Sequence, residues 1–169
     1  MKLKQIVPES FCLKCQGCCR FRQANSPWLP CLMHEEIQDL LDRKIPPVSI
    51  SIDRKIQPVF DPQSEMYLCA LLDKPSNKCK IYGFHPFECQ LYPFLINLRQ
   101  DKAIITVDMN CPYVEKSAHT QEFRDYVKYL TEFLNAPEQI KLIKNNPQNL
   151  EAYEELAKVI ELNLPDEAA

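Results

Sequence analysis

The chain of 169 residues has a formal net charge of −3, with 46% hydrophobic and 25% charged residues, which is the balance of an ordinary folded domain. Its acidic balance and the lack of a basic run argue against binding to nucleic acid or to an anionic membrane. Only two glycines occur, Gly17 and Gly83, so the sequence excludes a glycine-rich phosphate loop and a dinucleotide-binding turn.

The compartment decides how the nine cysteines are interpreted. The N-terminal segment reaches Cys12 without the apolar core of a signal peptide. No stretch approaches the roughly 18 apolar residues of a membrane span. We therefore expect a cytoplasmic protein, in which cysteines stay reduced or bind metal instead of forming disulfides.

Short elements are expected along the first two thirds of the chain, because many of the 14 prolines interrupt it. Apolar residues at helical spacing predict a short helix over Met33–Arg43. Turn residues between apolar segments predict two β-hairpins. The first pairs Gln57–Asp61 with Glu65–Leu72, and the second pairs Phe94–Arg99 with Ala103–Asp108.

After Tyr113 the pattern changes to that of helices. Apolar spacing and proline positions predict helices over Ser117–Asn135, over Glu138–Lys144 and from Pro147 to about Leu162. The last helix is expected to carry four apolar residues on one face, namely Leu150, Tyr153, Leu156 and Ile160. These helices would cover the core, or alternatively present a face to a protein partner.

The predicted fold class is α+β: a small irregular cysteine-cluster domain with two β-hairpins and short helices, followed by C-terminal helices. Seven of the nine cysteines lie between Cys12 and Cys79, and none follows Cys111. This change in composition predicts a metal-binding domain over residues 1–115 and a helical extension over residues 116–169 packed on it.

The sharpest motif is the run of four cysteines Cys12, Cys15, Cys18 and Cys19. A spacing of two residues between cysteines lets both sulfurs reach one ion, in zinc sites and iron–sulfur sites alike. The adjacent Cys18 and Cys19 point opposite ways in extended backbone. Either two centres share this loop, or one thiol of the pair is a ligand and the other supports it.

Four further cysteines follow in settings typical of turns or hairpin edges: Cys69, Cys79, Cys89 and Cys111. Eight thiolates suit two closed tetrahedral sites. The N-terminal spacing with a remote Cys-Pro is also similar to the way bacterial ferredoxins hold a [4Fe–4S] cluster. Counting ligands therefore leaves both zinc and iron open.

Five cations lie beside the cysteines in the sequence, namely Lys14, Arg20, Arg22, Lys78 and Lys80. They would offset the charge of the thiolates, or alternatively be ordinary solvated surface residues.

The order of these motifs, with Cys79-Lys-Ile-Tyr82, Pro86-Phe-Glu-Cys89 and Cys111-Pro112, resembles the CxxCxxCC family of YkgJ-type cysteine-cluster proteins over about residues 11–113. The resemblance implies chelation of zinc or iron. It implies eight metal-linked positions: Cys12, Cys15, Cys18, Cys19, Cys69, Cys79, Cys89 and Cys111. Cys31 falls outside the pattern and is expected to be a buried structural thiol.

The chain departs from the family pattern at two positions, since members usually carry arginine where His85 and Gln90 stand. The loss of two cations beside Cys89 argues against binding of an anionic substrate by this segment. His85 is a candidate for a ninth metal ligand. Because it directly precedes Pro86, we expect instead that it lies in a turn.

Three functions remain open at this point. We favour a metal-site protein whose centre is structural or handles metal or electrons, without catalysis. The second is an iron–sulfur enzyme for methyl transfer or redox chemistry, because flagellin lysine N-methylases have a similar cysteine motif. Glu88 and Asp108 are the carboxylates that an enzyme would use there, although a surface or strand-end place is the stronger expectation for both. The third is an adaptor in which metal holds the N-terminal domain together and the C-terminal helices bind a protein.

Overall fold

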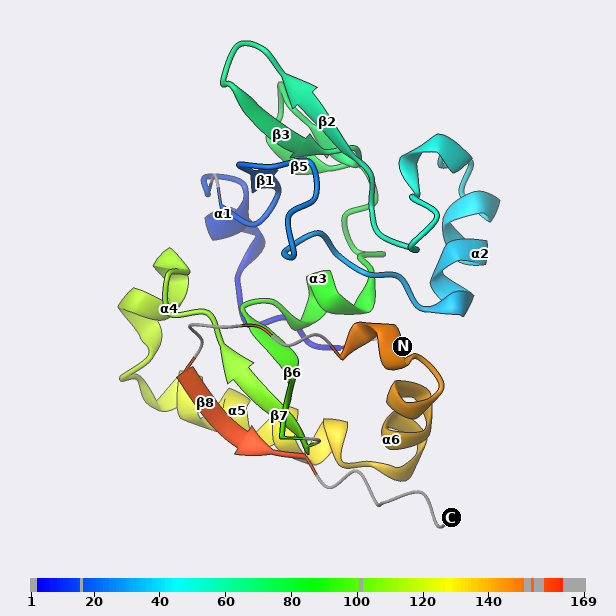
Figure 1. Ribbon diagram of the computed structural model, residues 1–169. Coiled ribbons are helices and arrows are strands. Elements are labelled where there is room, and N and C mark those ends of the chain that lie inside the picture. The colour runs from blue at the N-terminus through cyan, green and yellow to red at the C-terminus, as the bar shows by residue number, and fades with distance from the viewer. Residues whose placement is uncertain (1–2, 16, 101, 151–152, 154–156, 163–169) are drawn as a thin grey trace. The chain divides into compact units, whose positions relative to one another are not determined.

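The computed structural model describes residues 3–15, 17–100, 102–150, 153 and 157–162 (Figure 1). The chain divides into two compact units, Met1–Gln90 and Leu91–Ala169. Short helices and small antiparallel sheets alternate along it, which confirms the predicted α+β class. No helix in the described part is both long and apolar enough to cross a membrane.

The first unit is built from short elements. In chain order they are α1 (Glu9–Cys12), β1 (Arg20–Phe21), α2 (His34–Asp42), β2 (Pro58–Asp61), β3 (Met66–Cys69), β4 (Leu72–Asp73), β5 (Lys78–Cys79) and α3 (Phe87–Leu91). Strands β1, β3 and β2 form an antiparallel sheet with β3 in the centre, while β4 and β5 form a separate hairpin. The predicted helix over Met33–Arg43 and the first predicted hairpin are confirmed.

The core of the first unit is aliphatic. Its buried members are Leu32, Leu40, Ile56, Leu71 and Ile81. Two of the predicted metal ligands, Cys69 and Cys79, are partly buried and pack against this cluster. Both sulfurs therefore lie on a border that is apolar on one side, and burial there disfavours the ionised thiolate.

A carboxylate closes the turn between β2 and β3. Asp61 accepts hydrogen bonds from Ser64 Oγ at 2.5 Å and from Lys74 Nζ at 2.9 Å. The hydrogen bond from Lys74 is the main reason that the pKa of Asp61 is lowered to about 2, and the bond from Ser64 comes next.

We expect this turn to make the first unit sensitive to acid. Because the pKa of Asp61 is lower in the folded chain than its ordinary value of about 3.9, its stabilising effect is present above pH 4 and is lost as the pH falls towards 2. The variant Asp61→Asn should lose part of the acid dependence over this range, measured by urea unfolding at several pH values. An unchanged pH dependence in the variant would rule the turn out as its source.

The second unit combines a sheet with helices. Its elements are β6 (Phe94–Arg99), β7 (Lys102–Val107), α4 (Pro112–Ser117), α5 (Gln121–Leu134), α6 (Pro137–Lys144), a 3₁₀ turn at Pro147–Asn149 and β8 (Ala157–Glu161). The sheet has the order β6-β7-β8, and α5 packs against it through Phe94, whose ring lies 5.5 Å from that of Phe123 and 5.6 Å from that of Tyr126 (Figure 1). The second predicted hairpin and the helices that became α5 and α6 are confirmed.

The predicted helix from Pro147 to about Leu162 is wrong in the described residues. Only a 3₁₀ turn forms at Pro147–Asn149, and Ala157–Glu161 is the strand β8, paired antiparallel with β7. Leu156 of the predicted apolar face lies outside the described residues. A strand is favoured here because β7 would otherwise keep an edge of unpaired backbone groups, and the β-branched Val159 and Ile160 suit a strand. The Leu162 amide extends the pairing by donating to the Ala103 carbonyl at 2.8 Å.

The two units divide after Gln90, earlier than the predicted boundary after residue 115. The second hairpin belongs with the helices that follow it, because α5 covers its sheet. Cys111 therefore belongs to the second unit, while the other seven predicted metal ligands belong to the first. The extension of a metal-binding domain to residue 115 stays a prediction.

Candidate metal centre

The first two cysteines lie on one continuous turn of backbone. Cys12 is the last residue of α1, and the Cys15 amide donates to the carbonyls of Phe11 at 3.0 Å and of Cys12 at 3.1 Å. A Cβ atom added to Gly17 would lie 3.4 Å from Cys15 Sγ, so the sulfur of Cys15 lies against this glycine. The turn holds Cys12 and Cys15 close in space, as the spacing predicts.

Asn77 fastens this loop to the β4–β5 hairpin. Its Nδ2 group donates to the carbonyls of Leu13 at 2.7 Å and of Cys15 at 2.9 Å. Its Oδ1 atom accepts from Arg20 Nη2 at 2.7 Å. With a φ of 53°, Asn77 adopts the left-handed conformation that asparagine tolerates better than most residues. One side chain thus ties together the segments that carry Cys15, Cys19 and Cys79.

We expect Asn77→Gly to lower both the stability and the metal affinity of the first unit. Glycine keeps the left-handed backbone without strain, so this variant isolates three hydrogen bonds worth together about 2–3 kcal/mol. Asn77→Asp is the matched comparison, because it retains the acceptor for Arg20 and loses only the two donors. Urea unfolding followed by the fluorescence of Trp28 measures the loss. An Asn77→Gly protein as stable as the parent would show that the contact is dispensable.

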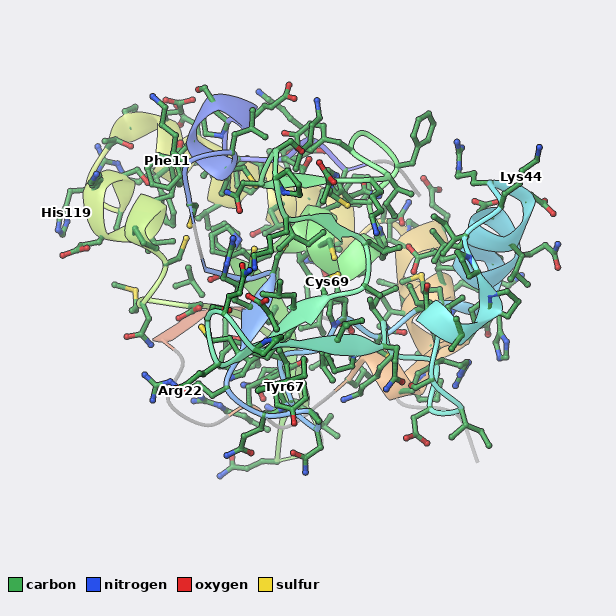
Figure 2. All side chains as sticks on the ribbon, turned by 90° about the horizontal axis from the view of Figure 1, so that it is seen from above. Phe11, Arg22, Lys44, Tyr67, Cys69 and His119 are labelled. Atoms are coloured by element: carbon green, nitrogen blue, oxygen red, sulfur yellow. The ribbon has the colours of Figure 1, made fainter. Side chains whose placement is uncertain are left out.

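Strand pairing brings the next cysteines together. The Cys69 amide donates to the Cys19 carbonyl at 3.0 Å, which continues the ladder of β1 and β3 by one residue. Cys79 on β5 is paired with Leu72 on β4, three residues after Cys69. Figure 2 labels Cys69 at the end of β3. Strand pairing thus sets Cys19 beside Cys69, and Cys79 lies on the separate β4–β5 hairpin that follows β3.

Backbone amides point at two of these sulfurs. The Cys69 sulfur accepts hydrogen bonds from the amides of Leu71 and Leu72, and the Cys79 sulfur accepts one from the amide of Ile81. Such N–H···S bonds lower the pKa of a thiol and stabilise the thiolate that a metal requires. The turns after Cys69 and Cys79 therefore offset part of the cost of ionising these buried thiols.

Cys89 comes from α3, and the half-buried carboxylate of Glu36 holds the start of this helix in place. Glu36 accepts from the Met33 amide at 2.9 Å and from the Phe87 amide at 2.5 Å, and so joins α2 to the first turn of α3. Burial is the main cause that raises the pKa of Glu36. Sequence analysis did not single out Glu36, since a carboxylate at the start of a helix is usually a surface residue. Its place before the apolar Ile37 and Leu40 was the only available signal.

Burial sets the ionisation of three thiols. It raises the pKa of Cys69 to about 12 and that of Cys79 to about 11, and it raises the pKa of Cys89 well above its ordinary value. Nearby thiols add to each shift: Cys19 acts on all three, and Cys69 and Cys79 act on Cys89. These sulfurs are therefore neighbours, and at neutral pH they are protonated when no ion is bound.

The adjacent pair behaves differently. A hydrogen bond between Cys18 and Cys19 raises the pKa of Cys18 and lowers that of Cys19, and Arg20 lowers the latter further. The charge of Cys12 acts on Cys18 and on Cys79. Six predicted ligands are thus gathered in the first unit: Cys12, Cys18, Cys19, Cys69, Cys79 and Cys89.

The thiols of the first unit do not form a complete metal coordination sphere in the structure. In the part of the chain that is described, no three Cys, His, Asp or Glu side chains stand in metal-binding geometry. The assignment of the eight cysteines as ligands accordingly stays a prediction. Cys111 is buried and lies directly before α4 in the second unit, and Cys31 is buried with 1% of its surface exposed, as expected.

The two candidate catalytic carboxylates make structural hydrogen bonds. Glu88 accepts from the Cys31 amide at 2.7 Å. Asp108 directly follows β7, at a strand end as expected, and is buried; it accepts from the Tyr92 hydroxyl at 2.8 Å and from the Asn110 amide at 2.9 Å. These bonds give both carboxylates a structural role, although Glu88 is also a close neighbour of Cys89.

The positions that depart from the family pattern hold the N-terminal segment. The Gln90 side chain accepts from the Leu3 amide at 2.8 Å and donates to the His85 carbonyl at 2.6 Å. The His85 ring meets that of Tyr82 edge-on at 4.7 Å, and burial lowers its pKa. A neutral glutamine amide here supplies both a donor and an acceptor, whereas an arginine would supply only donors.

Comparison with known proteins shows the family of the chain. A family model named CxxCxxCC and described as "Putative zinc- or iron-chelating domain" matches residues 11–112, more than half of the chain. The uncharacterised protein MJ0661 of Methanocaldococcus jannaschii is 42% identical over 41 residues, which cover 24% of this chain. The match spans only 22% of that relative's length. No solved structure matches the chain. Because the family model matches more than half of the residues, the chain belongs to the CxxCxxCC family.

Proposed function

We propose that this protein binds zinc or iron through cysteine thiolates, and that the centre is structural or serves metal or electron handling. The observation that carries the proposal is the gathering of six thiols from four separate segments of the first unit. Unrelated buried cysteines would have no reason to share one region. Soft thiolate donors select zinc or iron–sulfur centres over magnesium or calcium.

The residues present suit such a centre. Amides donate to the sulfurs of Cys69 and Cys79, and Arg20 lowers the pKa of Cys19, so three sulfurs have groups that favour the thiolate. The ninth cysteine, Cys31, has a structural role: its amide donates to the Glu88 carboxylate, and its backbone forms a β-bridge with Lys55.

A role without catalysis accounts best for the surrounding groups. An enzyme needs an acid or base that is available near the centre, whereas Glu88 is engaged with the Cys31 amide. A tetrahedral site with four thiolates leaves no open position for water or substrate. We place the protein in the cytosol, where thiols remain reduced, and its net charge of −3 disfavours nucleic acid as a partner.

Anaerobic purification followed by an absorption spectrum and elemental analysis tests the proposal. A brown protein with iron and acid-labile sulfide would identify an iron–sulfur cluster. A colourless protein with tightly bound zinc would identify a structural zinc centre. A chain that is folded, fully reduced and free of both metals, and that takes up neither on addition, would refute metal binding.

A further inference from the structure

We infer that Glu36 and Glu88 are positioning residues of the metal centre, because together they clamp the start of α3 to the segment before α2 and so fix where Cys89 lies. This role rests on the proposed function, in which Cys89 is a predicted ligand. It adds two carboxylates that act through hydrogen bonds to the backbone, outside the set of cysteines.

The two carboxylates link the same two segments in opposite directions. Glu36 reaches from α2 to the Phe87 amide, the first of α3, at 2.5 Å. Glu88 reaches back from α3 to the Cys31 amide at 2.7 Å. The second oxygen of Glu36 accepts from the Met33 amide at 2.9 Å. Because the segments are joined at more than one point, α3 cannot pivot about a single hydrogen bond.

The backbone of this clamp is shielded from water. Cys31, Met33 and Phe87, which supply the three amides, are exposed by only 1%, 2% and 1%. An amide that loses its acceptor in such surroundings keeps the full cost of its desolvation, whereas an exposed amide would bond to water. Removal of either carboxylate is therefore expected to shift the backbone of α3 instead of leaving it in place.

The helix that carries Cys89 needs this external support. With five residues, Phe87–Leu91, α3 is far shorter than a helix that is stable by its own hydrogen bonds. Cys89 follows Phe87 by two residues and Glu88 by one, so its Cβ direction is set by the turn that the clamp holds. The far end is held as well, since Gln90 accepts from the Leu3 amide at 2.8 Å.

The acidic type of these residues fits a role in hydrogen bonding better than a role of charge. Glu88 directly precedes Cys89, and a carboxylate next to a thiolate raises the electrostatic energy of the site. A carboxylate has two acceptor oxygens, and Glu36 uses both on amides. The position of α3, and not the charge beside it, is therefore what these side chains supply.

Metal protection of each cysteine in the full chain tests the positioning role. The reduced, metal-free protein is saturated under anaerobic conditions with Zn²⁺, or with Fe²⁺ and sulfide in a parallel sample, and is then alkylated with iodoacetamide. Peptide mass spectrometry gives the ratio of the labelling rates without and with metal. In Glu36→Ala this ratio should fall by about tenfold or more at Cys89. At Cys12 and Cys15 it should stay close to the parent value.

Two variants serve as matched controls. Glu35→Ala removes the neighbouring, exposed carboxylate of α2 and should leave Cys89 protected as in the parent. Asn77→Gly removes two hydrogen bonds to the loop of Cys12 and Cys15, so it should show the reverse pattern, with protection lowered in that loop and retained at Cys89. A general loss of stability would lower the protection of all these cysteines alike.

Glu88 separates hydrogen bonding from charge. Glu88→Gln removes the charge and keeps an acceptor for the Cys31 amide, so Cys89 should be protected as in the parent. Glu88→Ala loses the acceptor and should lower the protection of Cys89 by about fivefold, as expected for one hydrogen bond. An equal loss in both variants would show that the charge of Glu88 acts at the centre and would overturn its positioning role. The same pair decides the matter where Glu36→Ala does not fold.

The remaining outcomes separate the positioning role from metal binding. Unchanged protection of Cys89 in the two alanine variants, or an equal fall at every cysteine, would overturn the role of the clamp and leave metal binding intact. A parent in which Cys12 and Cys15 are protected while Cys89 is not would do the same. Absence of protection at every cysteine of the parent, with either metal, would instead refute the proposed function.

Discussion

Removal of bound metal is expected to lower the thermal unfolding midpoint of the first unit by about 10 °C or more. A ligand present at a thousand times its dissociation constant stabilises the folded state by about 4 kcal/mol. In a chain of this size, each kcal/mol corresponds to about 2–4 °C. The effect should be concentrated in the first unit, because the thiols of Cys69 and Cys79 border its aliphatic core.

The chain carries its own reporter for this measurement. Trp28 is the single tryptophan and belongs to the first unit, so its fluorescence follows the unfolding of that unit. Thermal unfolding is compared before and after treatment with a chelator under reducing conditions, and again after the metal is restored. An unfolding midpoint that is the same in all three samples would show that the centre does not support the fold.

Metal affinity is expected to rise steeply with pH, by up to about a thousandfold per unit below pH 9. The pKa values of Cys69 and Cys79 are raised to about 12 and about 11, and that of Cys89 is also raised, so three thiols are protonated at neutral pH. Binding must displace one proton from each, and each displaced proton contributes a factor of about ten per pH unit. Competition with a chromophoric chelator at pH 6, 7 and 8 measures the slope. A slope near zero would show that the ligands are already ionised.

The metal-free protein should show the opposite trend. A thiol whose pKa is higher in the folded chain than in the unfolded chain stabilises the fold below its ordinary pKa of about 8.5. That stability is lost as the pH rises through about 11 for Cys79 and about 12 for Cys69. Unfolding of the chelator-treated chain between pH 8 and pH 11 therefore serves as the control. A metal-free chain that gains stability over this range would contradict the burial of the thiols.

Local patterns in the sequence predicted most of the secondary structure. The two hairpins were recognisable because apolar strands flank turn residues, and the pairing of Phe94–Arg99 with Lys102–Val107 agrees with that reading. The helix Gln121–Leu134 was equally clear, since Phe123, Leu130 and Leu134 repeat at helical spacing and are buried. Such elements depend on neighbours in the sequence, which a single chain reveals.

The last strand, β8, could not be predicted from the local sequence pattern. Apolar residues after Pro147 have helical spacing, yet Ala157–Glu161 pairs with β7. The preference for a strand comes from the open edge of a sheet whose other strands end at Val107, far earlier in the chain. A short segment with a mixed pattern adopts the structure that its tertiary neighbours require.

By itself, the sequence determined the chemistry of the site: cysteines in the order of a metal-chelating family, in a chain too poor in glycine for nucleotide loops. Only the tertiary structure decided which cysteines meet. It set Cys19 opposite Cys69, and hydrogen bonds of Asn77 and Glu36 hold the loop of Cys12 and Cys15 and the start of the helix that carries Cys89. Sulfur type and spacing are local properties of a chain. Proximity between segments tens of residues apart arises from strand pairing and buried hydrogen bonds, which exist only once the chain is folded.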